Sequence, residues 1–285
     1  MMYDVAILGS GPAGISAALN LKLHDKQILW FGNPKGSRKV ELSEKIANYP
    51  GVPMISGADL NEKMLAQAAD MGLTLTDKMV TKISASGKGF MLLGDDEIFE
   101  AKSVLLAIGS VTAKGFDGED ALLGRGVSYC ATCDGFLYRG KTIAVFCGDR
   151  RYEHEAAYLA GLAEKVYLFT AYKDSEIDLF NVERIVQPIK AVEGEKRVTD
   201  LRLFDGSTLP VDGFFILRTA IAPATLLYGL ALEGPHIVAN HICETNIPGV
   251  FAAGDCTGRP YQIAKAVGEG NVAAHSILEY LAAHK

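Results

Sequence analysis

The N-terminal segment places two short apolar runs on either side of a longer stretch with helical composition. Val5–Leu8 and Gln27–Phe31 have the length and the β-branched or aromatic content of buried strands. The residues between them, from about Pro12 to Leu23, are rich in Ala, Leu and Ile and have the length of a helix. The pattern therefore predicts a strand, a helix and a second strand in succession, which is the unit from which parallel sheets are built.

The turn between the first strand and the helix has the sequence GSGPAG at positions 9–14. Gly9 permits a tight turn, Gly11 lets backbone approach a pyrophosphate, and Gly14 lets the helix pack on the strand. Pro12 suits the first turn of a helix, and Ala13 follows it. Because the helix N-terminus then faces the bound anion, this context favours a dinucleotide site over a purely structural glycine turn.

The second strand ends without the acidic residue that usually binds the adenine ribose of a dinucleotide. The sequence there runs through Trp30, Phe31 and Gly32 to Asn33. A polar amide or a backbone group would have to replace the carboxylate at this position.

Further periodic segments predict a helix, an antiparallel meander and a buried strand. Leu60, Met64 and Ala68 recur at helical spacing within about Ala58–Met71, as in a helix that faces the core. The expected meander strands lie at about Lys78–Ile83, Gly89–Leu93 and Glu97–Ala101, and a separate buried strand is expected at Ser103–Ser110.

The second half repeats the organisation of the first. It contains a strand, a helix and a strand, then two more strands, and finally a buried strand followed by a long helix. These elements are expected at Thr142–Phe146, Glu153–Ala163, Lys165–Phe169, Thr199–Phe204, Gly213–Leu217, Val250–Asp255 and about Gln262–Ala283. The last strand and helix are expected to rejoin the first domain.

Composition narrows the classes of partner. The chain has 285 residues, of which 49% are hydrophobic, 22% are charged and 30 are glycine, as in a globular protein of about two domains. Its formal net charge of −6 is spread along the chain without a basic block, which argues against nucleic acid or an anionic membrane as a partner. No apolar run is long enough to span a membrane and the start lacks a charged leader, so we expect a cytoplasmic protein.

Cys130 and Cys133 are the only close pair among five cysteines. In a reducing compartment such a CxxC pair is expected to be a redox pair. A zinc half-site completed by His236 and His241 is the alternative, but about a hundred residues separate the two halves, and no metal is expected. Three isolated cysteines are expected to be small buried apolar side chains: Cys147, Cys243 and Cys256.

Five motifs together resemble those of the low-molecular-weight thioredoxin reductases. They are GSGPAG at 9–14, NYPG at 48–51, AIGS at 107–110, CATCDG at 130–135 and FAAGD at 251–255. The resemblance implies an α/β fold with two Rossmann-like, three-layer ββα nucleotide-binding domains, the second inserted in the first. Residues 1–112 and 245–285 would form a discontinuous FAD-binding domain, and residues 113–244 an inserted dithiol domain.

The resemblance also implies roles for individual residues. Cys133 would face the flavin, Cys130 would exchange with the disulfide of thioredoxin, and Asp134 would move the proton, although a turn carboxylate before Gly135 is the alternative for Asp134. Asp255 would accept a hydrogen bond from the ribityl chain. The implied FAD-binding residues are Gly9, Gly11, Pro12, Ala13, Gly14, Asn48, Ala107, Gly109, Gly254, Asp255, Gln262 and Ile263.

The chain departs from the family at its second dinucleotide site. Cys147 and Asp149 stand where turn glycines belong, and Tyr152 stands where a small residue belongs. A carboxylate about 4 Å from a pyrophosphate oxygen costs on the order of 4 kcal/mol at an effective dielectric constant of about 20. The basic cluster for the 2′-phosphate is reduced to Lys173, and Arg150 with its neighbour Arg151 is expected to be a solvated helix-end pair. We therefore expect a degenerate NADPH-type site.

Two further departures lie near the FAD motifs. Tyr261 stands where the family has arginine, and Lys265 stands where it has a hydroxyl residue. The sequence does not assign either of them a role.

A retained dithiol beside a degenerate NADPH site is similar to the ferredoxin-dependent flavin thioredoxin reductases. That resemblance implies FAD as the cofactor, ferredoxin as the electron donor, thioredoxin as the substrate and a homodimer. A flavin can accept electrons one at a time and pass a pair to a disulfide. Three alternatives remain: an NADPH-dependent thioredoxin reductase, a dithiol oxidase, and a flavin redox sensor without turnover.

Overall fold

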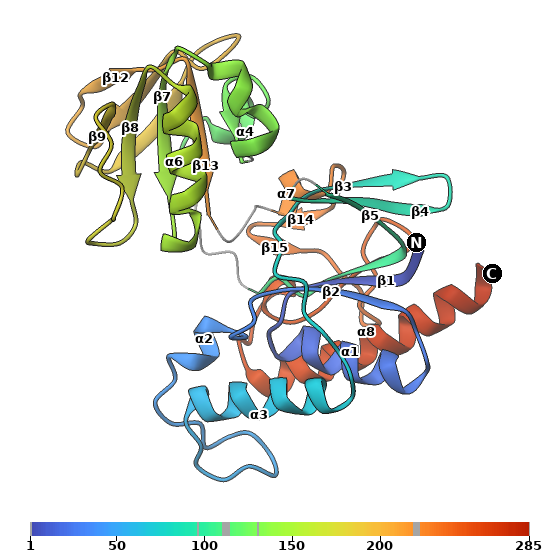
Figure 1. Ribbon diagram of the computed structural model, residues 1–285. Coiled ribbons are helices and arrows are strands. Elements are labelled where there is room, and N and C mark those ends of the chain that lie inside the picture. The colour runs from blue at the N-terminus through green and yellow to red at the C-terminus, as the bar shows by residue number, and fades with distance from the viewer. Residues whose placement is uncertain (1, 96, 110–114, 130, 219–222, 285) are drawn as a thin grey trace. The chain divides into compact units, whose positions relative to one another are not determined.

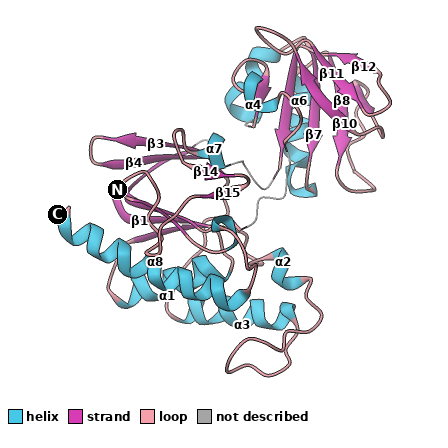
Figure 2. Ribbon diagram, turned by 180° about the vertical axis from the view of Figure 1, so that it is seen from behind, coloured by secondary structure: helices cyan, strands magenta, loops and turns pink. Residues whose placement is uncertain are grey.

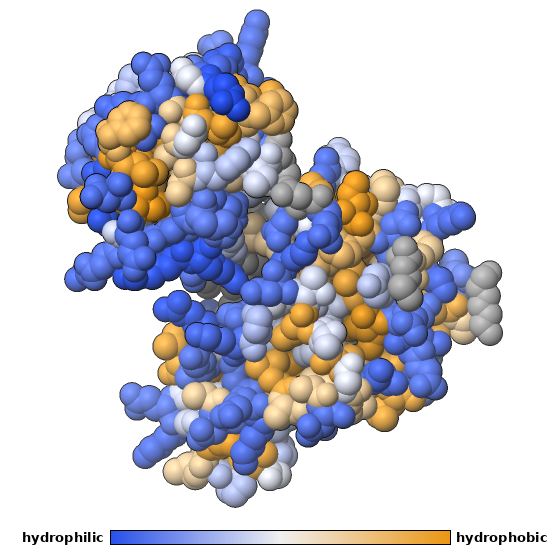
Figure 3. Space-filling model, in the orientation of Figure 1, coloured by the Kyte–Doolittle hydropathy of each residue, from blue (hydrophilic) through white to orange (hydrophobic). Residues whose placement is uncertain are grey.

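The computed structural model describes residues 2–95, 97–109, 115–129, 131–218 and 223–284. The chain forms two compact units, Met1–Thr112 with Ala222–Lys285 as unit 1, and Ala113–Ile221 as unit 2. The face of the molecule in Figure 3 is largely hydrophilic on both units, with apolar side chains in small patches. None of the helices in the described ranges is long and apolar enough to cross a membrane.

Unit 1 is built on a mixed sheet with the strand order β2-β1-β5-β4-β3, in which β16 also pairs with β5. Strands β2, β1, β5 and β16 run parallel, and β4 and β3 continue the sheet in antiparallel pairing. The bounds are β1 (Met2–Leu8), β2 (Ile28–Phe31), β3 (Val80–Ser86), β4 (Gly89–Gly94), β5 (Glu97–Leu106) and β16 (Val250–Ala252).

Three helices cover one face of this parallel sheet: α1 (Pro12–Leu23), α3 (Gly57–Asp70) and α8 (Ile263–Ala283) (Figures 1 and 2). Helices α1 and α8 cross closely, because a Cβ on Gly270 would lie 2.2 Å from the Ala13 oxygen. The Ser16 hydroxyl also donates to the Val267 carbonyl at 2.8 Å. This contact fixes the start of α8 beside the start of α1.

The expected meander strand at Glu97–Ala101 and the buried strand at Ser103–Ser110 are one strand, β5. Its first half pairs antiparallel with β4, and Val104–Leu106 pairs with β1 and β16. No turn residue separates Ala101 from Ser103, so nothing in the chain breaks the extended backbone there. The prediction of two strands was wrong, while the other predicted elements lie within a few residues of their positions.

Unit 2 contains a parallel sheet with the order β6-β13-β7-β8-β9 and an antiparallel sheet β10-β11-β12. Helix α6 (Glu153–Leu162) connects β7 to β8 (Figure 1). The strands are β6 (Val127–Ser128), β7 (Thr142–Cys147), β8 (Lys165–Thr170), β9 (Val182–Arg184), β10 (Ile189–Glu193), β11 (Asp200–Leu203), β12 (Thr208–Pro210) and β13 (Gly213–Leu217). The short helices are α4 (Glu119–Leu122), α5 (Ala131–Asp134), η1 (Gly135–Tyr138) and η2 (Arg150–Tyr152).

The chain returns to unit 1 at Ala222, earlier than the boundary at 245 expected from the sequence. Leu227 forms a bridge with Ile83 of β3, and the Asn246 side chain accepts from Ala231 N and donates to Gly229 O. These hydrogen bonds hold the intervening segment on unit 1. That segment contains α7 (Pro223–Leu226), β14 (Leu232–Glu233) and β15 (His236–Ile237).

A buried carboxylate joins three segments of unit 2. Glu119, with 2% of its surface exposed, forms an ion pair with Arg218 at the end of β13. Its Oε1 also accepts from the Tyr129 hydroxyl at 2.5 Å, and its Oε2 accepts from Phe116 N at 2.8 Å. The contacts of Glu119 therefore hold together the segments on both sides of β6 and the end of β13.

Replacing Glu119 by alanine should strongly destabilise unit 2. The substitution leaves the buried Arg218 guanidinium without a counter-ion, which lowers the free energy of unfolding by about 3–5 kcal/mol. Urea denaturation followed by circular dichroism measures this value. Glu183→Ala, which removes an exposed partner of Lys165, is the control and should leave the unfolding free energy nearly unchanged. Equal effects of the two substitutions would contradict the role of Glu119 as the buried counter-ion of Arg218.

Candidate functional site

The glycine-rich turn after β1 is shaped by two close backbone approaches. Gly9 has a φ of 121°, and a Cβ on it would lie 2.1 Å from the Ala107 oxygen. A Cβ on Gly14 would lie 2.0 Å from the Gly9 oxygen. Any side chain at either position would therefore push α1 away from β1 and β5, as the sequence analysis expects for these two glycines.

Gly11 differs from Gly9 and Gly14, because packing within the chain does not require a glycine at this position. A Cβ on Gly11 would meet only the Ser37 Cβ, at 3.7 Å. Gly11 is also the N-cap of α1, where no side chain of the described residues caps the helix. The open face and the uncapped N–H groups of Ala13 and Gly14 are what a pyrophosphate needs, so this turn fits FAD.

The C-terminal motif meets this turn. Gly254 follows β16 with a φ of 89°, and a Cβ on it would lie 3.0 Å from the Cβ of Ala13. Asp255 comes next, at the start of η3 (Asp255–Thr257), with its carboxylate largely buried. The Nζ of Lys39, in α2 (Arg38–Glu41), donates to its Oδ2 at 2.6 Å. Sequence reasoning missed Lys39, since nothing in the local pattern links it to Asp255.

The remaining residues predicted to bind FAD lie at the same carboxyl edge of the sheet. Gln262 is the N-cap of α8 and Ile263 its first residue, and the Gln262 Oε1 accepts from Asn48 Nδ2 at 2.8 Å. Ala107 is buried directly after β5, and Gly109 has a φ of 71° with open space where its Cβ would be. The structure thus brings the separate sequence motifs of unit 1 together, and their arrangement fits FAD.

Tyr261 lies between two cations. Lys39 Nζ is 4.3 Å and the Arg259 guanidinium 5.7 Å from the centre of its ring. Its hydroxyl lies 2.7 Å from the Nε2 of His236. His236 is therefore engaged with Tyr261, and no cluster of three His, Cys, Asp or Glu side chains within the described residues could hold a metal ion.

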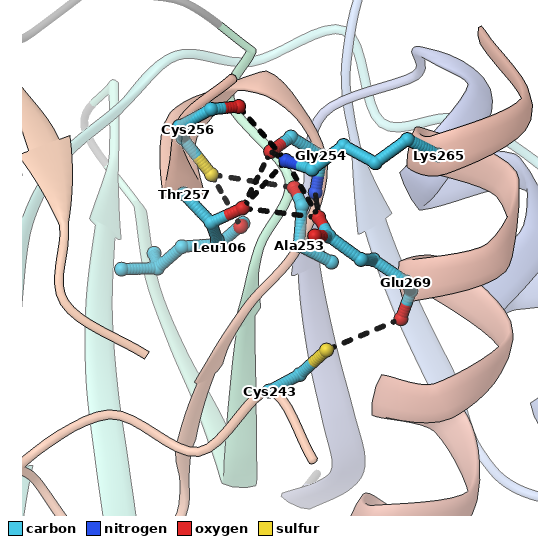
Figure 4. A network of polar contacts seen from close by, with 9 residues as sticks. Leu106, Cys243, Ala253, Gly254, Cys256, Thr257, Lys265 and Glu269 are labelled. Atoms are coloured by element: carbon cyan, nitrogen blue, oxygen red, sulfur yellow. Dashed lines mark hydrogen bonds and ion pairs between the residues drawn. The ribbon is translucent and has the colours of Figure 1, made fainter. Parts of the chain in front are cut away.

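The isolated cysteines are buried, as predicted. Burial raises the pKa of Cys256 to about 12 and that of Cys243 to about 11. The Cys256 thiol lies 3.2 Å from Leu106 O, and the Cys243 thiol 3.5 Å from Glu269 O (Figure 4). Burial also raises the pKa of Cys147. These thiols stay protonated near neutral pH, so they are structural rather than reactive.

The dithiol segment belongs to unit 2. Cys130 lies outside the described residues, and of Cys133 only the backbone, within α5, is described. Asp134 ends α5, and its Oδ2 accepts from the Ser128 hydroxyl at 2.7 Å. The roles predicted for the two cysteines and Asp134 therefore stay predictions.

The second dinucleotide-type turn, after β7, carries the substitutions noted in the sequence. Cys147 is fully buried at the end of β7, and Asp149 uses its Oδ1 to accept from Arg151 N at 3.2 Å, which caps η2. The Tyr152 side chain is buried at the start of α6. The turn is held by its own side chains and presents a carboxylate where a pyrophosphate would lie.

A second carboxylate lies beyond the carboxyl ends of β7 and β8. The Tyr172 hydroxyl, beyond the end of β8, lies 3.3 Å from Cys147 Sγ and donates to Glu153 Oε1 at 2.8 Å. Glu153 also accepts from Glu176 N at 3.3 Å. Burial opposes its ionisation, but hydrogen bonds from Ser175, Tyr172 and the Glu176 backbone outweigh this and lower the pKa of Glu153. An anion of the protein thus occupies the N-terminus of α6.

Arg150 lies at a helix end with 52% of its side chain exposed, as the sequence analysis expected, and it also contacts the loop after β8. Its Nη2 donates to the Lys173 carbonyl at 3.2 Å, its Nη1 lies 3.8 Å from Glu176, and its guanidinium is 5.7 Å from the centre of the Tyr172 ring. The distant loop after β8 folds back to reach it, which sequence spacing does not reveal. The carboxylates of Asp149 and Glu153 at this turn would lie close to the phosphates of NADPH, so the residues here do not fit that nucleotide.

Comparison with known proteins gives a consistent assignment. The family described as pyridine nucleotide-disulphide oxidoreductase matches residues 3–171 and 181–270. A thioredoxin reductase of Listeria monocytogenes is 34% identical over 98% of this chain and 94% of the relative. A ferredoxin-flavin thioredoxin reductase from Clostridium acetobutylicum has a crystal structure with 43% identity, a TM-score of 0.90 and 99% coverage of both chains. A thioredoxin reductase from Gloeobacter violaceus gives 29% identity, a TM-score of 0.80 and coverage of 100% and 95%. The chain therefore belongs to the pyridine nucleotide-disulphide oxidoreductases and, within them, to the thioredoxin reductases, which are FAD-binding oxidoreductases.

Proposed function

We propose that this flavoenzyme reduces the disulfide of thioredoxin with electrons from reduced ferredoxin, through Cys130 and Cys133. The similarity to the ferredoxin-flavin thioredoxin reductase from Clostridium acetobutylicum supports this donor. The resemblance to the family also leads us to propose a homodimer, which light scattering in solution tests.

The observation that carries the donor assignment is the pair of carboxylates, Asp149 and Glu153, at the turn after β7 and the start of α6. Glu153, the first residue of α6, accepts from Tyr172 and from Glu176 N, so its carboxylate is held near the helix end whose N–H groups a pyrophosphate would use. The side chain of Tyr172 reaches from the end of β8 to Cys147 at the end of β7. NADPH would have to displace these contacts and approach the carboxylates of Glu153 and Asp149. A protein that delivers electrons directly to the flavin does not need to bind at this site.

The residues of unit 1 would hold FAD in three ways. The N–H groups of the first turn of α1, after Gly11, would bind the pyrophosphate, and Asp255 would accept a hydrogen bond from a ribityl hydroxyl. The start of α8, at Gln262 and Ile263, would place its N–H groups and positive dipole end at the pyrimidine edge. Bound FAD supplies a centre that accepts electrons singly and releases them in pairs.

The dithiol would perform the exchange with thioredoxin. The Cys130 thiolate attacks one sulfur of the thioredoxin disulfide, which forms a mixed disulfide and releases one thioredoxin thiolate. Cys133 then attacks the Cys130 sulfur, forms the Cys130–Cys133 disulfide and releases the second thiolate. Asp134 is close enough in sequence to take the Cys133 proton and pass it on. Two electrons and two protons restore the dithiol.

An apolar surface beside the dithiol helix supports a protein substrate. Phe136 and Leu137, in η1 directly after α5, expose 60% and 55% of their surfaces. Exposed apolar side chains next to a reacting group favour docking of another protein. Thioredoxin would cover this surface while its disulfide reaches Cys130.

A basic surface in unit 1 supports an acidic electron donor. Arg259 is exposed and Lys39 half-exposed, and both flank Tyr261, which directly precedes Gln262 at the start of α8. Ferredoxins are acidic, and complementary charges speed the encounter of two proteins. We propose that ferredoxin docks over Tyr261.

Anaerobic titration of the FAD-loaded protein tests the donor. We expect reduced ferredoxin to bleach the flavin absorbance and to release thioredoxin thiols, and we expect NADPH to do neither. Efficient bleaching by NADPH would show an NADPH-dependent enzyme and refute the proposal. Flavin reduction without any thiol release would favour the redox sensor. In a separate aerobic assay, oxygen uptake with small dithiols would favour the oxidase.

Reversing the charge of Arg259 tests the docking surface. We expect Arg259→Glu to slow ferredoxin-driven flavin reduction at low salt on the order of tenfold, because electrostatic attraction is lost. The difference should shrink as salt is added. Reduction by dithionite, which needs no docking, should be unchanged. Arg184→Glu on β9 of unit 2 changes the net charge equally and is the control. Equal slowing by both variants would argue against docking at Tyr261.

A further inference from the structure

Lys265 occupies an unusual place for a cation. It lies in the first turn of α8, where the helix dipole disfavours positive charge, and only 18% of its side chain is exposed. A largely buried ammonium needs acceptors for its hydrogens, because desolvation of an unpaired charge is unfavourable. The contacts of Lys265 therefore indicate what the residue does.

The Lys265 ammonium has three acceptors in the turn at residues 254–258 and a fourth in Glu269 of α8. Its Nζ lies 2.8 Å from Gly254 O, 2.9 Å from Thr257 Oγ1 and 2.9 Å from Gly258 O. Its charge is balanced by Glu269, one turn further along α8, whose Oε2 is 3.1 Å away (Figure 4). A hydroxyl, which the family has at this position, brings a single donor hydrogen, whereas an ammonium brings three.

Glu269 binds the same turn from the other side. Its Oε2 accepts from Gly254 N at 2.7 Å and lies 3.0 Å from the Thr257 hydroxyl oxygen. Both polar groups of the Gly254 backbone are thus bound to α8, the N–H by Glu269 and the carbonyl by Lys265 (Figure 4). The ion pair therefore clamps the turn onto the helix.

The clamp encloses Asp255. Gly254 and Gly258, on either side of η3, have φ values of 89° and 123°, which residues other than glycine rarely adopt. Two such glycines give a turn many alternative conformations, and the hydrogen bonds from Lys265 to both carbonyls select one of them. Asp255 lies between these carbonyls, so the clamp holds the backbone that carries it, while Lys39 binds its carboxylate.

We propose that the Lys265–Glu269 pair orients Asp255 for FAD, which makes Lys265 a positioning residue that acts through Asp255. The inference rests on the proposed role of Asp255 as the acceptor of a ribityl hydroxyl. It is independent of whether ferredoxin or NADPH is the electron donor. It also gives a reason for the lysine that the chain carries where the family has a hydroxyl.

Titration of the apoprotein with FAD, followed by FAD fluorescence, tests the inference without any turnover. Removing a charged hydrogen bond weakens an interaction by about tenfold to a hundredfold. We expect Lys265→Met and Asp255→Asn each to raise the FAD dissociation constant by about tenfold or more. Lys63→Met, at an exposed position of α3, is the control and should bind FAD like the parent chain.

The double variant separates positioning from general stability. If Lys265 acts through Asp255, Lys265→Met should weaken FAD binding little further in a chain that already carries Asp255→Asn. Full additivity of the two effects would overturn the inference, as would a lower melting temperature of the Lys265→Met apoprotein without a change in FAD affinity. If Asp255→Asn alone leaves FAD affinity unchanged, the assigned role of Asp255 is wrong and the inference falls with it.

Discussion

The start of α1 lies so close to β5 and α8 that two of the glycines around it have no room for a side chain. A Cβ on Gly9 would lie 2.1 Å from Ala107 O, and one on Gly270 would lie 2.2 Å from Ala13 O. These contacts bring the start of α1, the end of β5 and the first turns of α8 to one edge of the sheet. The uncapped N-terminus of α1 and the Gly254 turn then face that edge, so the proposed FAD site of unit 1 follows from the close packing of its backbone.

Unit 2 also has a parallel sheet, but the turn after its strand β7 does not fit a dinucleotide. Its turn after β7 carries Cys147 and Asp149 instead of glycines, and the N-terminus of α6 is occupied by Glu153. The Glu153 carboxylate places a negative charge at this helix end, and the Tyr172 hydroxyl reaches from the loop after β8 to Cys147. One sheet edge therefore fits a dinucleotide, and the other is filled by the chain itself. This contrast is the physical basis for proposing a protein electron donor.

The glycine motif and most strands and helices could be predicted from the sequence, because close backbone approach and hydrophobic periodicity are encoded locally. Glu153 and Tyr172 could not be paired from the sequence, since the loop after β8 has to fold back before they meet. Lys265 had no assignable role, because two of its four acceptors are backbone carbonyls of a preceding turn. The boundary at 245 was wrong because hydrogen bonds from Asn246 hold the preceding segment on unit 1. The dithiol stays a prediction, since the side chains of Cys130 and Cys133 lie outside the described residues.

Calorimetric titration of the FAD-loaded protein with NADPH and NADH tests the central claim, that the chain's own side chains occupy the turn after β7 and the start of α6 in unit 2. The account predicts no saturable heat with either nucleotide up to about 1 mM, because binding would have to displace the Tyr172–Glu153 contact and bring phosphate next to two carboxylates. Saturable binding of one nucleotide per chain in the micromolar range would contradict it.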